Sequence, residues 1–309
     1  MIRQLLLLCL ASSAFAQPSG VYCLFGIDEN INDVNNAQAW NDSVVSGVAV
    51  RVQWSTLEPA QGTYSWAYLD NAVAKAQSTG KKVAISVLAG CFSPAWVYNL
   101  SHEFLTFTGT DAHDGKRMPA PWDPNYLSAW TTFISNLGAR YGGLPAVAYF
   151  TVTGLGHGEE CFLCANSKDA PQFNVQAWLS AAQQIVTAYD SASKGTPYLV
   201  VWGKPAPGQV KTQSGCMYQV YSVNNHVGFK ADSLSSSFPS KTLLEGQLAV
   251  QLGQNNRPVV FQALRTSGSG SALASVVKNG ETMRMESLEC YRTDVDNPDC
   301  QAVLGDFNR

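Results

Sequence analysis

Short apolar runs alternate with amphipathic stretches along most of the chain. Each run is a near-continuous series of apolar residues of strand length, which is typical of strands buried on both faces. The runs cover residues 21–26, 47–54, 82–89, 146–153, 197–202, 226–231, 258–264 and 283–291. Between several of them, apolar residues recur at spacings of three, four and seven, the period of a helix with one buried face. The clearest such helices are expected around Trp66, Tyr126 and Trp178, with a weaker one around Leu244.

Strands that alternate with helices predict a parallel sheet covered by helices, an α/β fold. With eight expected strands in 309 residues, the (β/α)8 or TIM barrel fits best. A doubly wound open sheet is the alternative, but the first strand-to-helix turn lacks G-x-G-x-x-G. One long insert, residues 91–123, follows the third expected strand and is rich in aromatic residues, which argues against disorder.

The N-terminus has the form of an export signal. Met1-Ile2-Arg3-Gln4 supplies a charged start, residues 5–10 an apolar core, and residues 14–16 an Ala-Phe-Ala cleavage site. We therefore predict a signal peptide over residues 1–16 and a single barrel domain over residues 17–309 of a secreted, extracellular or periplasmic protein. The apolar run is too short to span a membrane. A net charge of −3 gives no electrostatic reason to bind nucleic acid or an anionic membrane, and we expect a monomer.

Seven cysteines lie beyond residue 16, and disulfides are the default expectation in an exported protein. The local pairs Cys161/Cys164 and Cys290/Cys300 are the first candidates. Cys161-x-x-Cys164 is also compatible with zinc or redox chemistry, but no second Cys or His pair stands at zinc spacing. We expect no metal and no cofactor.

Candidate chemistry centres on residues 151–164, TVTGLGHGEECFLC, which follow the fourth expected strand. This Gly-rich segment delivers Glu159 and Glu160 beside His157. A buried strand that ends in an acid-bearing loop is how a barrel enzyme presents a general acid at its open face. The alternative is a solvated loop with two surface acids.

Other strands also carry polar groups toward that face. Arg51 alternates with Val50 and Val52, and a charge is costly against the apolar helix layer, so Arg51 should point into the barrel. Glu289 and Tyr291 share one parity at the end of the eighth expected strand, whereas Glu286 has the other parity and should form an outward salt bridge. Further polar or aromatic groups at strand ends are Trp202, Asp232 and Gln262.

Residues 50–70, VRVQWSTLEPAQGTYSWAYLD, resemble the second-strand signature of clan A glycoside hydrolases, especially the β-galactosidase-like and cellulase-like barrels. Residues 118–143 are similar to the segment that such enzymes place before strand four. The resemblance implies a TIM-barrel glycoside hydrolase acting on a poly- or oligosaccharide, with Glu58 and Pro59 in structural roles. The matched positions in the first segment are Trp54, Glu58, Pro59, Gly62, Tyr64, Trp66, Leu69 and Asp70.

The resemblance also implies an acid/base Glu after strand four, usually in Asn-Glu, and a nucleophilic Glu at the end of strand seven. This chain instead has Gly158-Glu159-Glu160 and Gln262, and an amide cannot serve as a carboxylate nucleophile. We predict Glu160 as the acid/base, with Glu159 as its alternative, and Glu289 as the ionised carboxylate. The expected substrate-binding residues are Arg51, Trp54, His157, Trp202, Asp232, Gln262, Tyr291 and Trp122.

Gln262 and the missing Asn-Glu equally suit an inactive barrel that only binds carbohydrate. A serine hydrolase is disfavoured because no G-x-S-x-G follows a strand, and a zinc hydrolase because H-E-x-x-H is absent.

Overall fold

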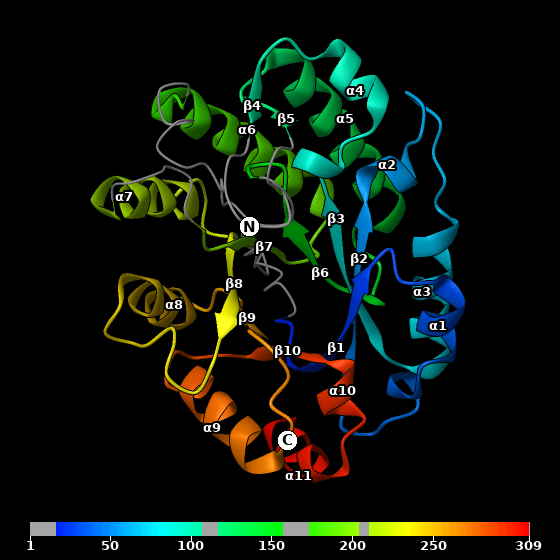
Figure 1. Ribbon diagram of the computed structural model, residues 1–309, viewed down its shortest axis with the longest axis vertical. Coiled ribbons are helices and arrows are strands. Elements are labelled where there is room, and N and C mark those ends of the chain that lie inside the picture. The colour runs from blue at the N-terminus through cyan, green and yellow to red at the C-terminus, as the bar shows by residue number, and fades with distance from the viewer. Residues whose placement is uncertain (1–16, 107–116, 157–172, 204–209, 309) are drawn as a thin grey trace, which may run out of the picture.

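The computed structural model describes residues 17–106, 117–156, 173–203 and 210–308. Its centre is a closed parallel barrel in the order β1-β10-β9-β8-β7-β6-β3-β2, which confirms the (β/α)8 prediction (Figure 1). The barrel strands are β1 (Gly20–Ile27), β2 (Gly47–Gln53), β3 (Lys82–Leu88), β6 (Val147–Val152), β7 (Tyr198–Val201), β8 (Gly228–Leu234), β9 (Val259–Ala263) and β10 (Ser287–Tyr291).

Helices surround the barrel and cover its outer face (Figure 1). The long ones bury the apolar stripes expected from their sequence, as in the burial of Trp130 and Phe133 on one helix and of Trp178 and Ile185 on another. The α-helices are α1 (Ile31–Asn36), α2 (Trp54–Leu57), α3 (Ala67–Thr79), α4 (Ala95–Leu100), α5 (Pro124–Tyr141), α6 (Val175–Ser193), α7 (Val210–Tyr221), α8 (Leu244–Gln254), α9 (Gly270–Glu281), α10 (Arg292–Val295) and α11 (Pro298–Phe307), with 3-10 turns η1 (Gln38–Trp40) and η2 (Gly90–Phe92).

The apolar core has two parts, as strand alternation requires. Outward-facing residues join the helices in one large cluster, and inward-facing residues form a smaller cluster inside the barrel. In the inner cluster, small residues such as Ala49 and Ala84 leave room for the rings of Tyr22 and Tyr149, which meet edge-on with centroids 5.5 Å apart. The barrel interior is therefore filled by side chains and is not a pore.

The second-strand segment has a structural role. Glu58 is 3% exposed; its carboxylate accepts hydrogen bonds from Trp54 Nε1 at 2.9 Å and from the backbone N–H of Gly62 at 2.9 Å. This geometry confirms the structural role expected for Glu58. Trp54 itself is fully buried among the rings of Trp96 and Trp130, so the prediction that it contacts sugar is wrong: no face of the ring is available to a ligand.

The insert after β3 forms its own small structure. It contains η2, α4 and an antiparallel pair of strands, β4 (Phe104–Thr106) and β5 (Arg117–Pro119). Asp123 links this insert to α5, because its carboxylate accepts hydrogen bonds from the backbone N–H groups of His102, Glu103, Asn125 and Tyr126. Burial opposes ionisation of Asp123, but these four bonds outweigh it and hold its pKa below the usual value.

The cysteine expectation fails where the structure describes it. Cys290 and Cys300 are both buried and both free thiols, so the disulfide expected between them is not formed. Burial, together with the nearby Asp294 carboxylate, raises the pKa of both, as expected for thiols in an apolar layer. Cys161 and Cys164 lie outside the described residues, as do residues 1–16, so the second pairing and the signal peptide remain predictions.

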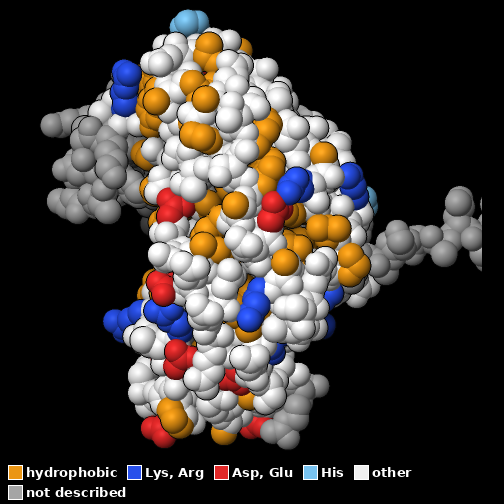
Figure 2. All heavy atoms as spheres, turned by 90° about the vertical axis from the view of Figure 1, so that its right-hand side faces the viewer, with side chains coloured by type: hydrophobic (Ala, Val, Ile, Leu, Met, Phe, Trp, Pro, Cys, Tyr) orange, Lys and Arg blue, Asp and Glu red, His pale blue; other side chains and the backbone are white. Residues whose placement is uncertain are grey.

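The surface seen in Figure 2, on the side of α1 and α3, intersperses acidic and basic side chains and does not gather them by sign. Within the described ranges, no helix is long and apolar enough to cross a membrane.

Candidate active site

An ionic network lies inside the barrel. Lys230 on β8 places its Nζ 2.6 Å from Asp232 Oδ1 and 3.2 Å from Glu289 Oε2 on β10. The side chains of Lys230 and Glu289 are 1% and 2% exposed, and that of Asp232 is 9% exposed. The buried Lys230 ammonium therefore bridges carboxylates on two strands, which gives each buried charge a partner of opposite sign. The structure thus points Glu289 inward, and its cationic neighbour is Lys230, whereas Arg292 pairs with Glu29.

Tyr149 completes the coordination of Glu289. Its hydroxyl donates to Glu289 Oε1 at 2.6 Å, so both oxygens of this carboxylate are engaged. Burial first, and the Glu289 charge second, raise the pKa of Tyr149 well above its usual value, so the phenol stays protonated and continues to donate. Sequence reasoning missed both Tyr149 and Lys230. The signal for Lys230 was its shared parity with Asp232 in GFKADSL.

Gln262 occupies the strand between the two acids. On β9, Gln262 is paired with Glu289 of β10. The residue before Gln262, Phe261, is paired with Ala231 of β8. Gln262 is 5% exposed, and its Oε1 has no hydrogen-bond partner among the described residues. Asp232 Oδ2 is also enclosed and without a partner in the described part of the chain.

The rim beside β1 and β2 carries further charges. Arg51 follows the barrel-lining Ala49 by two residues, and its Nε donates to the backbone carbonyl of Phe25 at 3.1 Å. On the other side of this rim, Arg292 and Glu29 form an ion pair of 2.6 Å. The inward direction predicted for Arg51 agrees with this placement.

The aromatic candidates lie in different surroundings. Trp202 directly follows β7, its backbone N–H donates to the Lys230 carbonyl at 2.8 Å, and its half-buried ring meets Tyr218 edge-on. Tyr291 ends β10 and packs against the inner cluster. Trp122 lies in the insert, where its Nε1 donates to Glu103 Oε2 at 2.7 Å. Trp202 and Tyr291 are therefore the aromatic candidates at the ends of barrel strands.

The acidic segment after β6 is not described. His157, Glu159 and Glu160 all lie outside the described residues, so the structure does not place the expected general acid. The four positions that follow Val152 are Thr153, Gly154, Leu155 and Gly156, so neither glutamate directly follows the strand.

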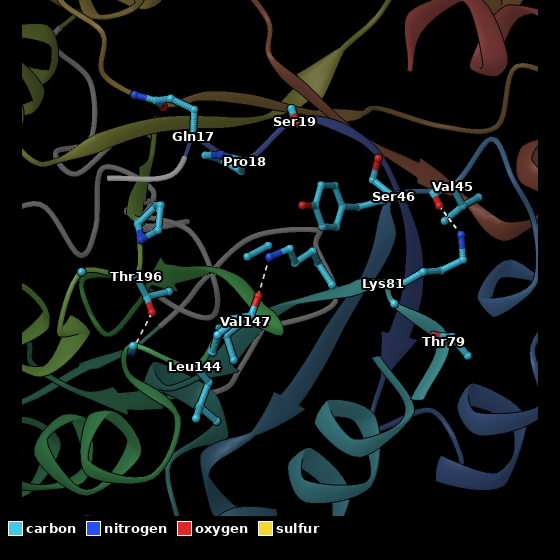
Figure 3. A pocket seen from close by; sticks show the side chains of 18 of the residues that line it. Gln17, Pro18, Ser19, Val45, Ser46, Thr79, Lys81, Leu144, Val147 and Thr196 are labelled. Carbon is cyan, nitrogen blue, oxygen red and sulfur yellow. Dashed lines mark hydrogen bonds between the residues drawn. The ribbon is translucent and has the colours of Figure 1, made fainter. Parts of the chain in front are cut away.

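A hollow lies at the opposite end of the barrel, where strands begin (Figure 3). This lower hollow measures about 610 Å³ and is lined by segments that precede β1, β2, β3, β6 and β7. In Figure 3, Lys81 reaches away to the Val45 carbonyl, and Thr196 accepts from the Gly143 N–H. Active sites of TIM barrels form at the other end, where strands finish, so we assign the lower hollow to the scaffold.

No metal centre emerges from the described side chains, which contain no group of three or more His, Cys, Asp or Glu arranged to hold an ion. The network offers two carboxyl groups and further hydrogen-bond acceptors, which suit general-base, nucleophilic or hydroxyl-binding roles.

Comparison with known proteins identifies the family of this chain. Residues 35–207, more than half of the chain, match the family model described as beta-galactosidase (Glyco_hydro_42). The chain belongs to this beta-galactosidase family. The match includes β2, β3 and β6 with the acidic segment after them, and it ends before β8, β9 and β10, which carry the ionic network.

Individual relatives agree with the family. Beta-galactosidase BgaA from Thermus sp is 29% identical over 144 residues, and a beta-galactosidase from Arthrobacter sp is 31% identical over 144 residues. Each match covers 45% of this chain, but only 22% and 20% of those relatives, so the shared stretch is about a fifth of their length.

Solved structures share the fold. The catalytic domain of beta-amylase from Paenibacillus polymyxa superposes with a TM-score of 0.61 at 8% identity, over 93% of this chain and 95% of that one. An endo-beta-1,4-glucanase from Xanthomonas axonopodis pv. citri, carrying a triple mutation, gives 0.56 at 13% identity, over 94% and 99%. At these identities the likeness establishes the barrel and nothing finer.

Proposed function

We propose that this chain is a secreted glycoside hydrolase that cleaves O-glycosidic bonds of an oligo- or polysaccharide at the end of the barrel where the strands finish. The observation that carries the proposal is the buried Lys230 network, which holds Glu289 and Asp232 as inward carboxylates on barrel strands. Membership of the beta-galactosidase family supports the reaction class, and the names of the relatives make a β-galactoside the first substrate to try.

In this mechanism two carboxyl groups divide the work. Glu160, with Glu159 as its alternative, gives a proton to the departing glycosidic oxygen while the bond to the anomeric carbon breaks. An ionised carboxylate, Glu289, either attacks the anomeric carbon or takes a proton from the attacking water. Lys230 and the Tyr149 hydroxyl each contact one oxygen of Glu289 and hold this carboxylate in position.

The test is hydrolysis of aryl glycosides, beginning with 4-nitrophenyl β-galactoside, and of plant, algal and fungal polysaccharides. Glu160→Gln and Glu289→Gln should each lower kcat by at least about 10³-fold. The matched control is Glu281→Gln, the same change at an exposed site on α9, which should leave kcat unchanged. Full activity in Glu289→Gln would contradict the two-carboxylate assignment. The anomer first released, followed by NMR, separates retention from inversion.

A second candidate function is carbohydrate binding without catalysis. Gln262, the amide at the seventh barrel strand, favours it, because an amide binds sugar hydroxyls but cannot act as nucleophile. If no glycoside is cleaved while a sugar raises the melting temperature, this second function replaces the first.

A further inference from the structure

Within the network, Glu289 and Asp232 differ in what their oxygens contact. Glu289 has one oxygen beside Lys230 and the other bonded to Tyr149. Asp232 has Oδ1 beside Lys230, whereas Oδ2 has no partner among the described residues although it is enclosed. A buried polar atom without a partner is rare, because it loses its bonds to water without replacing them. Asp232 therefore retains an acceptor for a group that the described residues do not supply.

A second such acceptor lies on the neighbouring strand. Gln262 Oε1 is enclosed and unpartnered in the described part of the chain. The β8–β9 ladder pairs Ala231 with Phe261 and then, after a register shift, Leu234 with Ala263. Asp232 and Gln262 therefore follow the same ladder pair on adjacent strands, at the irregular part of the ladder. On β9, Val260 points into the barrel, so Gln262, two residues later, has the same inward parity. On β8, Lys230 belongs to the inner network, so Asp232, two residues later, also has inward parity.

The identity of residue 262 suits this role electrostatically. Lys230 already faces two carboxylates, Asp232 and Glu289, and Gln262 stands beside them. A glutamate at this position would add a third negative charge around the same ammonium, and like charges in a buried site disfavour ionisation of one another. The amide supplies an acceptor without that charge.

We propose that Asp232 Oδ2 and Gln262 Oε1 together accept hydrogen bonds from two neighbouring hydroxyl groups of one sugar ring. Both atoms are acceptors, so the ligand must bring donors, and a vicinal diol brings two from one edge. This subsite rests on the proposed function only in that the site takes carbohydrate, and it holds for an enzyme and for a binding protein alike. A sugar that lacks either hydroxyl leaves one acceptor buried and unpaired, which is how hydrogen-bonding sites reject such analogues.

The experiment measures binding by calorimetry with galactose, glucose, mannose and xylose, and then with the single deoxy derivatives of the best binder. Asp232→Asn should weaken binding about 10- to 100-fold, and Gln262→Met, which keeps the length but loses the acceptor, about 10-fold. The deoxy series should show two adjacent positions at which wild-type binding falls most. Gln262→Met should be insensitive to loss of one of them and Asp232→Asn to loss of the other.

The matched control is Glu286→Gln. Glu286 is another carboxylate with an enclosed, unpartnered oxygen, but it precedes β10 at the opposite end of the barrel, so sugar affinity should not change. Melting temperatures identify any variant that fails to fold. Gln262→Met should destabilise the protein less than Asp232→Asn, because it removes no charge.

The outcomes separate this inference from the proposed function. Hydrolysis with wild-type KM in both Asp232→Asn and Gln262→Met would overturn the subsite and leave the enzyme standing. Sugar binding that the two variants weaken, without hydrolysis of any glycoside, would support the subsite and remove the enzyme. No binding of any of the four sugars, or a deoxy series without two adjacent sensitive positions, would also overturn the subsite.

Discussion

Lysines at the two ends of the barrel are used in opposite ways. Around the lower hollow, the ammonium groups of Lys81, Lys82 and Lys194 each donate to backbone carbonyls of segments that precede or connect the strands. Inside the barrel, Lys230 faces two carboxylates. Lysines that end on backbone carbonyls fasten parts of the scaffold to one another, whereas Lys230 joins two acids on different strands inside the barrel.

The two ends of the barrel also differ in their cavities and in their unpaired polar atoms. The lower hollow measures about 610 Å³, yet its lining lysines are already bonded to the backbone. The network end is recognised instead by enclosed oxygens of Asp232 and Gln262 that lack a donor within the described residues. We therefore place the candidate site at the enclosed acceptors beside the ionic network and not at a cavity chosen for its size.

The strongest test of the contrast compares two lysines. Lys230→Met removes the ammonium that lies between Asp232 and Glu289, which should lower the free energy of unfolding by about 3–5 kcal/mol. Lys82→Met removes an exposed ammonium from the Pro145 carbonyl and should cost less than about 1 kcal/mol. Urea unfolding at neutral pH measures both changes. Equal losses would show that Lys230 also serves only as scaffold.

Asp123, a carboxylate bonded to backbone N–H groups outside the network, should affect stability and not chemistry. Asp123→Ala removes the acceptor of four backbone N–H groups at the start of α5 and should cost about 2 kcal/mol at pH 7. Because the pKa of Asp123 is lowered in the folded state, its stabilisation is complete above the unfolded value of about 3.9 and is lost as the pH falls through the folded value.

Urea unfolding of wild type and Asp123→Ala at several pH values from neutral to acid should therefore show a difference that shrinks toward low pH. KM for any substrate should stay unchanged at neutral pH. A raised KM would place Asp123 in the site and weaken the distinction between the acids of the network and acids that only cap the backbone.

The smallest expected effect concerns Glu286 at the lower end. Its Oε2 is enclosed without a partner in the described residues, so the outward salt bridge expected from sequence is not formed. Burial raises the pKa of Glu286, partly offset by a hydrogen bond to the backbone. A raised folded pKa gives stability that is present below the unfolded value and lost as the pH rises through the folded value.

Glu286→Gln should therefore stabilise the protein at neutral pH, by less than about 1 kcal/mol since the group is partly solvated, and the gain should disappear in acid. Thermal unfolding at pH 4 and pH 8 measures the difference. A variant less stable than wild type at pH 8 would mean that the ionised Glu286 has a partner.

The sequence predicted the barrel well because buried parallel strands are continuous apolar runs bounded by polar turns. The predicted strand bounds are wrong where that pattern changes. β8 continues to Leu234 through Asp232 and Ser233, beyond the apolar run, because inward positions near the open end are polar. The last strand begins only at Ser287, because the apolar Met283 and Met285 before it are buried in the outer core without being part of the strand.

The site was less predictable, since its contacts join strands far apart in the chain. Parity indicated that Glu289 faces inward, and position at a strand end singled out Asp232 and Gln262. Neither signal could show that Lys230 bridges the two acids or that Tyr149 reaches across from β6. Trp54 illustrates the converse error. Its position after β2 suited a sugar platform, yet a hydrogen bond to Glu58 and the surrounding rings place it in the core.

The closure of the barrel determines when this site can exist. β10 carries Glu289 and is the strand that pairs with both β1 and β9. A chain still being synthesised can make the stretch that matches the family, through residue 207, and yet hold none of the three residues Lys230, Gln262 and Glu289. The last strand that closes the barrel also completes the charge network, so the site forms only when the whole fold has formed.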